Sequence, residues 1–190
     1  ANAVNGIINI KTRHAAKTRG HAVTMGGGTE ELGFGSVRHG GRWGGSIAYR
    51  GYAKYNRRGD SVNAVGRNLN DGWDHWRAGF RVDGNLAKRR SRWMLKGEYY
   101  RGDIGQTIVE VPIGLNAPYT ATYNNQIGIS GMHLQGRWVR RAERGGKLAV
   151  QTYFHCTRRG DRFNGAESRN TYDLELQQNR VSRGRHSLVW

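Results

Sequence analysis

Apolar and polar residues alternate with period two along most of this chain, and that alternation limits what it can fold into. Between residues 76 and 83, every even position is apolar and every odd position is charged or glycine. A period of two indicates strands with one apolar and one polar face, and no window of the sequence fits a helix comparably well. The same alternation recurs in the segments 47–56, 93–100, 132–138, 148–156 and 172–177.

Three weaker segments extend the pattern toward both ends of the chain. Two of them, 21–27 and 32–38, precede the strong segments, and a third begins near Arg185 and runs to Trp190. Together the segments predict about nine antiparallel strands, each of the length that tilted membrane strands need. No apolar stretch approaches the ~20 residues of a membrane-spanning helix. The sequence therefore predicts an all-β fold.

The connections between these strands alternate in length, which favours a membrane barrel over a soluble sandwich. Bacterial outer-membrane barrels alternate long external loops with short periplasmic turns. The mean hydropathy of -0.78 is low for a compact core, but it suits a barrel with a wet inner face. We expect long connections at 57–73, 102–128 and 158–168, and short turns at 87–90, 141–146 and 182–184.

The strongly basic composition implies anionic partners. Lys and Arg number 31 against 14 acidic residues, which gives a formal net charge of +17. Nucleic acid, anionic lipid and an anionic solute would all be attracted to such a charge. Basic residues occur in every hairpin instead of one stripe, and no nucleic-acid-binding motif is present, so we expect no specific nucleic acid partner.

Nothing in the sequence predicts catalytic chemistry or a bound cofactor. The single cysteine, Cys156, excludes an internal disulfide framework and a zinc cluster built on cysteine spacing. It falls on the apolar register of its segment, where we expect it to be inert. The seven histidines are scattered, without the spacing of a metal site. We therefore expect a protein that is not an enzyme and holds no metal or cofactor.

The first thirteen residues, Ala-Asn-Ala-Val-Asn-Gly-Ile-Ile-Asn-Ile-Lys-Thr-Arg, are the most specific text in the chain. They resemble the closing segment of the plug domain in TonB-dependent outer-membrane receptors. Gly6 permits a tight approach before a short strand, 7–11, that is apolar enough to be buried. The segments 26–31, 33–37 and 49–55 resemble the family's first barrel hairpins, and 74–82 resembles its fourth barrel strand. The plug-end motif comprises Asn2, Val4, Asn5, Gly6, Ile8 and Asn9.

The resemblance implies an antiparallel transmembrane β-barrel preceded by the last strand of a plug domain. Residues 1–14 would end the plug, and residues 15–190 would form the N-terminal part of the barrel. Barrels of this class need about 22 strands, so we expect a fragment of a larger receptor. The family resides in the Gram-negative outer membrane and takes up scarce solutes such as ferric siderophores or cobalamin. It is driven by the partner protein TonB, whose binding segment, the TonB box, we do not find here.

Two sets of residues are candidate functional positions. The first is basic and would face the barrel lumen, where it would attract anionic cargo. For any single residue, a simpler role in solvating the channel or pairing with the plug is favoured. The second set would form the aromatic girdle where the barrel meets outer-membrane lipid headgroups. The basic set is Arg50, Lys54, Arg77, Arg81 and Arg137, and the girdle set is Trp76, Trp93, Tyr99 and Trp138.

Two other functions remain open. A basic β-rich nucleic-acid-binding protein would use aromatics interleaved with arginine to stack on bases. A small complete outer-membrane barrel, such as an adhesin or a pore, would need an even strand count and closure. The plug-like start argues against the small barrel. The loops 57–73 and 102–128 would carry solute specificity in the parent receptor, but they contain no recognisable ligand signature.

Overall fold

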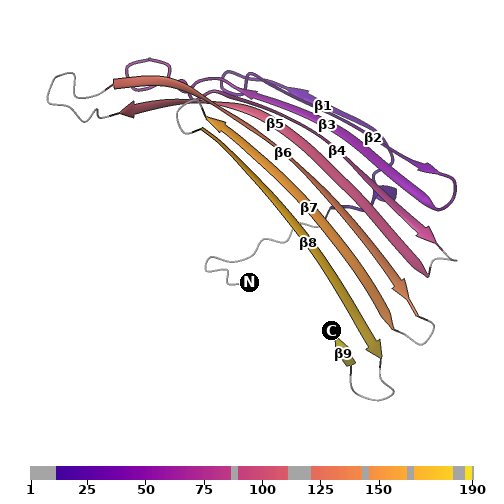
Figure 1. Cartoon of the computed structure of the whole chain (residues 1–190). Coiled ribbons are helices and arrows are strands. Elements are labelled where there is room, and N and C mark those ends of the chain that lie inside the picture. The colour runs from indigo at the N-terminus through magenta and orange to yellow at the C-terminus, as the bar shows by residue number, and fades with distance from the viewer. Residues whose placement is uncertain are drawn as a thin grey trace.

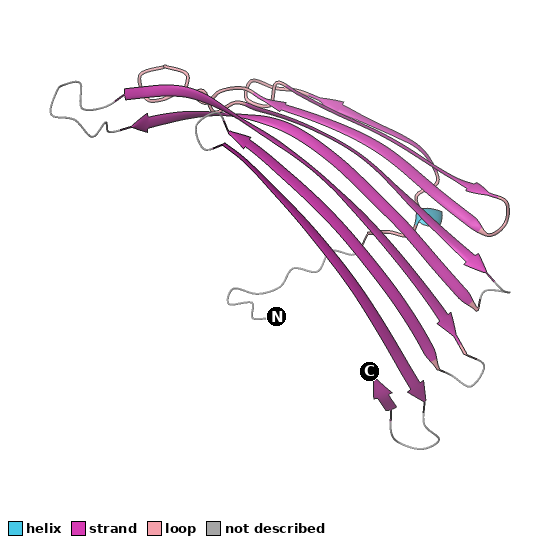
Figure 2. Ribbon diagram, in the orientation of Figure 1, coloured by secondary structure: helices cyan, strands magenta, loops and turns pink. Residues whose placement is uncertain are grey.

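The protein folds into one antiparallel sheet in which each strand pairs with the next along the chain, in the order β1 to β9 (Figures 1 and 2). The computed structural model describes residues 12–86, 90–110, 121–142, 146–161, 165–181 and 187–189. Their helical content is a three-residue 3-10 turn, η1, at Ala15–Lys17. No helix in these ranges is long and apolar enough to cross a membrane. The strands are β1 (Gly20–Gly26), β2 (Gly33–Trp43), β3 (Ile47–Arg58), β4 (Trp73–Leu86), β5 (Ser91–Glu110), β6 (Ala121–Arg141), β7 (Lys147–Asp161), β8 (Gly165–Val181) and β9 (Ser187–Val189).

The predicted all-β antiparallel fold is confirmed, and each of the six strongly alternating segments lies within a strand. The weaker segments 21–27 and 32–38 each extend one residue beyond their strand. The sheet is open over the described residues, because β1 and β9 stand at its two ends without pairing to one another. The plug-end motif at residues 2–9 lies outside the described residues. Closure into a barrel and the presence of a plug therefore stay predictions.

Two of the predicted long loops are wrong. Most of 102–128 belongs to strands, because β5 continues to Glu110 and β6 begins at Ala121. Likewise β7 reaches Asp161 and β8 starts at Gly165, so most of 158–168 is paired. The backbone ladder continues here although polar side chains occupy both faces. Without an apolar face there is no alternation to reveal a strand.

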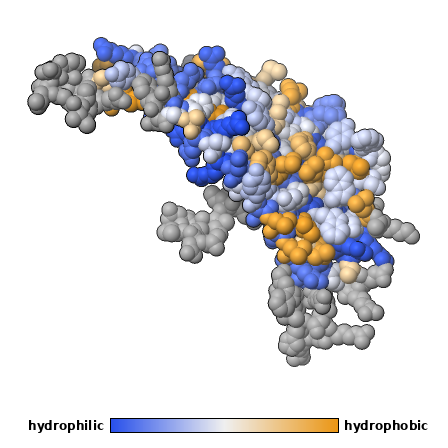
Figure 3. All heavy atoms as spheres, viewed as in Figure 1, coloured by the Kyte–Doolittle hydropathy of each residue, from blue (hydrophilic) through white to orange (hydrophobic). Residues whose placement is uncertain are grey.

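The two faces of the curved sheet differ in chemistry. Successive side chains of a strand point to opposite faces, and cross-strand partners share a face. A row of partners on the convex face runs from Val37 through Ala53, Ala78 and Tyr99 to Met132. In Figure 3, hydrophobic side chains gather over the middle of the sheet, while hydrophilic ones prevail toward the end that carries the extensions of β5 and β6.

Little of the convex face is covered by the described chain. Among the described residues, the buried hydrophobic ones are small apart from Ile127, and no large side chain is fully buried. On the convex face, Leu134 is 41% and Tyr172 75% exposed. Contiguous apolar surface of this kind marks a contact with lipid or protein. The sheet thus presents an apolar face that needs a cover from outside these residues.

Aromatic rings lie over glycines on neighbouring strands, which accounts for part of the high glycine content. Each ring belongs to the residue directly opposite the glycine. It fills the space that a Cβ atom would occupy if the glycine were replaced by a larger residue. Such pairs keep the sheet packed where glycine lets it bend. The pairs are Phe34 with Gly26, Tyr49 with Gly41, Tyr52 with Gly79, Phe80 with Gly97, Trp93 with Gly84, and Tyr100 with Gly131.

Candidate functional site

The five basic residues singled out from the sequence all point to the concave face of the sheet. Arg50 lies directly opposite Arg81, and Lys54 lies directly opposite Arg77. Arg137 shares this face farther along the sheet, on β6. The structure thus groups the first four on adjacent strands and leaves Arg137 apart. Their assignment to a lumen stays a prediction, since a lumen requires a closed barrel.

Like charges meet directly across three strands of this face. The partner of Arg81 on β5 is Lys96, so Arg50, Arg81 and Lys96 form one row. Opposed like charges destabilise a sheet unless other groups compensate. Part of the compensation is Asp83, which accepts hydrogen bonds from Arg81 Nε at 2.7 Å and Nη2 at 2.8 Å. The sequence analysis did not single out Asp83, whose role depends on these contacts.

The segment 12–18, which lies against the concave face, supplies hydrogen-bond acceptors to two of these cations, Arg50 and Arg81. Arg81 Nη1 donates to the carbonyl of Thr12 at 3.2 Å and to its hydroxyl at 2.6 Å. Arg50 Nη1 donates to the carbonyl of Arg13 at 3.3 Å and the hydroxyl of Thr18 at 3.4 Å. The amide of Ala15 donates to Asp83 Oδ2 at 2.8 Å. We call residues 12–18 the anchor segment.

The anchor segment is fixed by its own local structure as well as by the sheet. His14 caps η1 by accepting from the amide of Ala16, and the amide of Thr18 donates to the carbonyl of Ala15. Ala15 is 0% and Thr18 5% exposed. The Thr18 carbonyl sits against Gly40, where a side chain would collide with it. In Figure 1 the segment runs along the inside of the arch formed by the strands.

A basic cavity of about 470 Å³ lies beside the anchor segment on the concave face. Arg38, Arg50, Lys54 and Arg77 contribute cations, and Glu98 contributes a carboxylate. Glu98 is already engaged, because it accepts from the Tyr52 hydroxyl and lies 3.8 Å from Arg77. The buried Nε of Arg38 has no hydrogen-bond partner among the described residues. The cavity therefore has uncompensated positive charge, which suits a carboxylate or phosphate group.

The four predicted girdle residues all point to the convex face. Trp76 and Tyr99 approach with ring centroids 5.2 Å apart. Trp93 lies directly opposite Trp138. These aromatics form two zones. Trp76 and Tyr99 form one near position 76 of β4, and Trp93 and Trp138 form the other, level with position 84 of β4. The zones are separated by about 26 Å along the strand, at ~3.3 Å per residue.

The remaining groups give no sign of a metal or redox site in the part of the chain that the structure describes. No three residues among its His, Cys, Asp and Glu come together as metal ligands. Cys156 is partly exposed on the convex face, opposite Met132. This placement agrees with the register expected from the sequence.

Comparison with known proteins does not identify the chain. No family model matches it. No curated protein and no solved structure matches it either.

Proposed function

We propose that this chain forms part of the barrel wall of a TonB-dependent outer-membrane transporter, preceded by the end of the plug domain. The observation that carries the proposal is the two-faced sheet. Its convex face is apolar and uncovered, and its concave face is polar and basic. A membrane barrel needs this division, with lipid outside and water inside.

The two aromatic zones support the membrane part of the proposal. Outer-membrane barrels carry an apolar band about 25 Å tall between aromatic girdles. The zones at Trp76 and at Trp93 with Trp138 lie about 26 Å apart along the strand. At a strand tilt of about 40°, that separation corresponds to roughly 20 Å across the membrane. The apolar residues between them would then face the acyl chains.

The anchor segment supports the plug part of the proposal. Its first two residues, Thr12 and Arg13, are the last two of the stretch whose sequence resembles the end of a TonB-dependent plug. It lies on the concave face, which is the side where a plug would sit. The basic cavity beside it favours an anionic solute as cargo.

The proposal requires additional strands between β9 and β1. Backbone N–H and C=O groups at an open edge cannot stand in hydrocarbon without partners. We expect these strands from the rest of the parent protein, in line with the about 22 strands of this barrel class. TonB would then move the plug to open a path, with no covalent chemistry.

The proposal is tested by expressing the full-length gene that contains this coding region in a Gram-negative host. We expect a heat-modifiable outer-membrane protein on gel electrophoresis. We also expect uptake of a radiolabelled ferric siderophore or cobalamin that is lost in a strain lacking TonB. Uptake that persists without TonB would contradict the transporter. A heat-modifiable monomer formed by residues 15–190 alone would favour a small complete barrel instead.

A further inference from the structure

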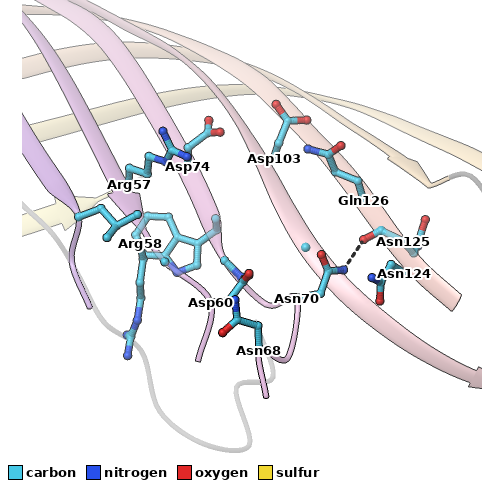
Figure 4. A pocket seen from close by; sticks show the side chains of 15 residues that line it. Arg57, Arg58, Asp60, Asn68, Asn70, Asp74, Asp103, Asn124, Asn125 and Gln126 are labelled. Atoms are coloured by element: carbon cyan, nitrogen blue, oxygen red, sulfur yellow. Dashed lines mark hydrogen bonds between the residues drawn. The ribbon is translucent and has the colours of Figure 1, made fainter. Parts of the chain in front are cut away.

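A second, larger cavity of about 780 Å³ lies at the opposite end of the sheet from the β2–β3 turn, beside the loop 59–72. The loop joins β3 to β4 and folds over β5. Figure 4 shows side chains of the loop, Asp60, Asn68 and Asn70, on one side of the cavity. Side chains of the strands, among them Asp103 and Gln126, lie on the other side. Most of the lining is polar, and Leu32 and Trp73 are its large apolar side chains.

The loop holds its shape through its own hydrogen bonds. Asn63 Oδ1 accepts from the amides of Val65 at 3.1 Å and Arg67 at 2.9 Å. Asp60 Oδ1 accepts from the amide of Gly72 at 2.8 Å, which closes the base of the loop. A loop tied in this way presents its side chains in fixed positions, which lowers the entropy cost of binding a ligand.

Further hydrogen bonds fasten the loop to the convex side of the sheet. The amide of Gly105 donates to the carbonyl of Gly72 at 2.8 Å, and the Thr107 hydroxyl donates to that of Leu69 at 2.9 Å. Asn70 Nδ2 donates to the carbonyl of Gln106 at 3.3 Å. Asn70 adopts a left-handed backbone, with φ of 51°. Strained residues of this kind cluster at binding sites, where the surrounding structure holds them in place.

Several polar groups of the cavity have no hydrogen-bond or ion-pair partner among the residues that the structure describes. Asp74 and Asp103 lie directly opposite one another, an arrangement that costs stability for two carboxylates. Asp74 also lies directly opposite Arg57 on β3. Even so, neither carboxylate forms a hydrogen bond or an ion pair with another of the described residues. The exposed side chains of Asn68 and Gln126 likewise form no hydrogen bond within the described part of the chain. These groups are available to a ligand.

The balance of the lining favours a ligand that is rich in hydroxyl groups. Arg57 and Arg58 oppose Asp60, Asp74 and Asp103, and Arg58 is also paired with Glu30 at 3.0 Å, so no charge of one sign dominates. Amide and carboxylate side chains offer adjacent donors and acceptors in one plane. Neighbouring hydroxyls of a sugar ring match that spacing. The volume lies within the range of about 300–1,000 Å³ that is usual for small-molecule sites.

We propose that this cavity binds a saccharide, held by Asn68, Asn70, Asp74, Asp103 and Gln126. Two sources have this chemistry: a soluble oligosaccharide and the sugar headgroup of a membrane glycolipid. The cavity row of Asp74 and Asp103 adjoins the convex-face row of Tyr55 and Trp76. If the proposed function holds, the position of the cavity beside this aromatic row places it level with the lipid headgroups on the outer side of the membrane. The saccharide site itself does not depend on membrane insertion.

The test measures saccharide binding to the full-length parent protein in detergent micelles, by saturation-transfer NMR and titration calorimetry. The two probes are the water-soluble core oligosaccharide released from lipooligosaccharide and intact lipooligosaccharide. The variant is Asn68→Ala combined with Gln126→Ala, which removes two exposed amides without removing a hydrogen bond of the loop. Its matched control is Asn170→Ala, an exposed amide on the convex face of β8, outside the cavity.

We expect the double variant to weaken binding by about tenfold or more, and the control to leave the dissociation constant unchanged. Binding of both probes supports a site that recognises the saccharide and does not need the lipid. Binding of the intact glycolipid alone, with the same sensitivity to the variant, supports a headgroup site. No binding of either probe, or equal loss in the variant and the control, overturns the proposal. Heat-modifiable folding is scored separately, so failure of the transporter proposal is distinguishable from failure of the saccharide site.

Discussion

Arg81 and Asp83 form a two-point ion pair on the concave face of β4, with Nε–Oδ2 at 2.7 Å and Nη2–Oδ1 at 2.8 Å. The Asp83 side chain is 4% exposed and that of Arg81 14%. The same carboxylate accepts from the amide of Ala15, and the same guanidinium donates to Thr12. One pair of residues therefore joins the strand to the anchor segment.

Replacing Asp83 with asparagine should release the anchor segment. The change leaves the partly buried guanidinium of Arg81 without a counter-charge, and breaking such a pair costs about 3 kcal/mol. We expect lower unfolding midpoints in urea and faster trypsin cleavage after Lys17. The matched control is Glu167→Gln, which breaks the exposed pair with Arg169 and costs less than about 1 kcal/mol. If the two variants lost the same stability, the contacts between Asp83 and the anchor segment would contribute no more than an exposed ion pair.

Neighbouring positions on β6 separate lipid-facing from water-facing sites. Leu134 points to the convex face and Gln135 to the concave face. An arginine on the lipid face near the membrane midplane costs about 2–4 kcal/mol. We expect Leu134→Arg to weaken folding into lipid vesicles by this amount, and Gln135→Arg to change it by less than about 1 kcal/mol.

The measurement for this pair is the folding equilibrium of the full-length protein in vesicles, followed by tryptophan fluorescence. Both variants add the same charge, so the net charge effect cancels. If Gln135→Arg were the more damaging change, the proposed orientation of the two faces would be reversed.

The strands could be predicted because successive residues of a strand face opposite sides of the sheet, so a strand with one apolar and one polar face has an alternating sequence. Residues 76–83 show this most plainly, with an apolar side chain at each even position. The extension of β5 beyond Asp103 has polar residues on both faces, so its pairing with β6 left no such pattern. Backbone hydrogen bonds between β5 and β6 hold those parts of the sheet together. The pattern of apolar and polar side chains does not reveal such bonds.

The site could be predicted only in part, for a related reason. Alternation placed Arg50 and Arg81 on the polar face, but it could not show that they oppose one another, since that depends on strand register. The bond between Ala15 and Asp83 joins residues 68 positions apart. Arg38 was missed because its segment alternates weakly. The cavity beside the loop 59–72 depends on how that loop folds back, which has no periodic signal.

Gly79 is a position where a single methyl group should test the glycine–aromatic packing. A Cβ there would lie 2.7 Å from the Tyr52 hydroxyl oxygen and 2.9 Å from the carbonyl oxygen of Gly97. Because the carbonyl belongs to the backbone, it cannot move aside easily. We expect Gly79→Ala to lower the free energy of unfolding by about 1–3 kcal/mol.

The control for this change is Gly35→Ala, in the same sheet. A Cβ at Gly35 meets no atom within 4 Å. Alanine there should leave stability unchanged or raise it by about 0.5–1 kcal/mol, because glycine loses more backbone entropy on folding. Urea titration in detergent compares the two. A larger loss at Gly35 than at Gly79 would show that the close contacts at Gly79 do not limit stability.

Asp71 should make the loop 59–72 sensitive to acid. The Ser61 hydroxyl and amide both donate to its carboxylate, and these hydrogen bonds hold the pKa of Asp71 below its ordinary value of 3.8. A depressed carboxyl pKa contributes stability that is present above the ordinary value and is lost as the pH falls through the folded value. The loop should therefore hold its shape at neutral pH and loosen only below about pH 4.

The measurement is the NMR chemical shift of the Ser61 amide between pH 7 and pH 2. We expect it to titrate with the carboxyl of Asp71 in the native protein, and to lose that titration in Asp71→Asn. The amide of Asn85, which donates to the carbonyl of Ser46 outside the loop, serves as the reference. If the Ser61 and Asn85 amides shifted together, the change would reflect unfolding of the whole sheet. If Ser61 titrated alone, the acid-sensitive step would be confined to the loop beside the proposed saccharide cavity, and saccharide binding should then fall over the same pH range.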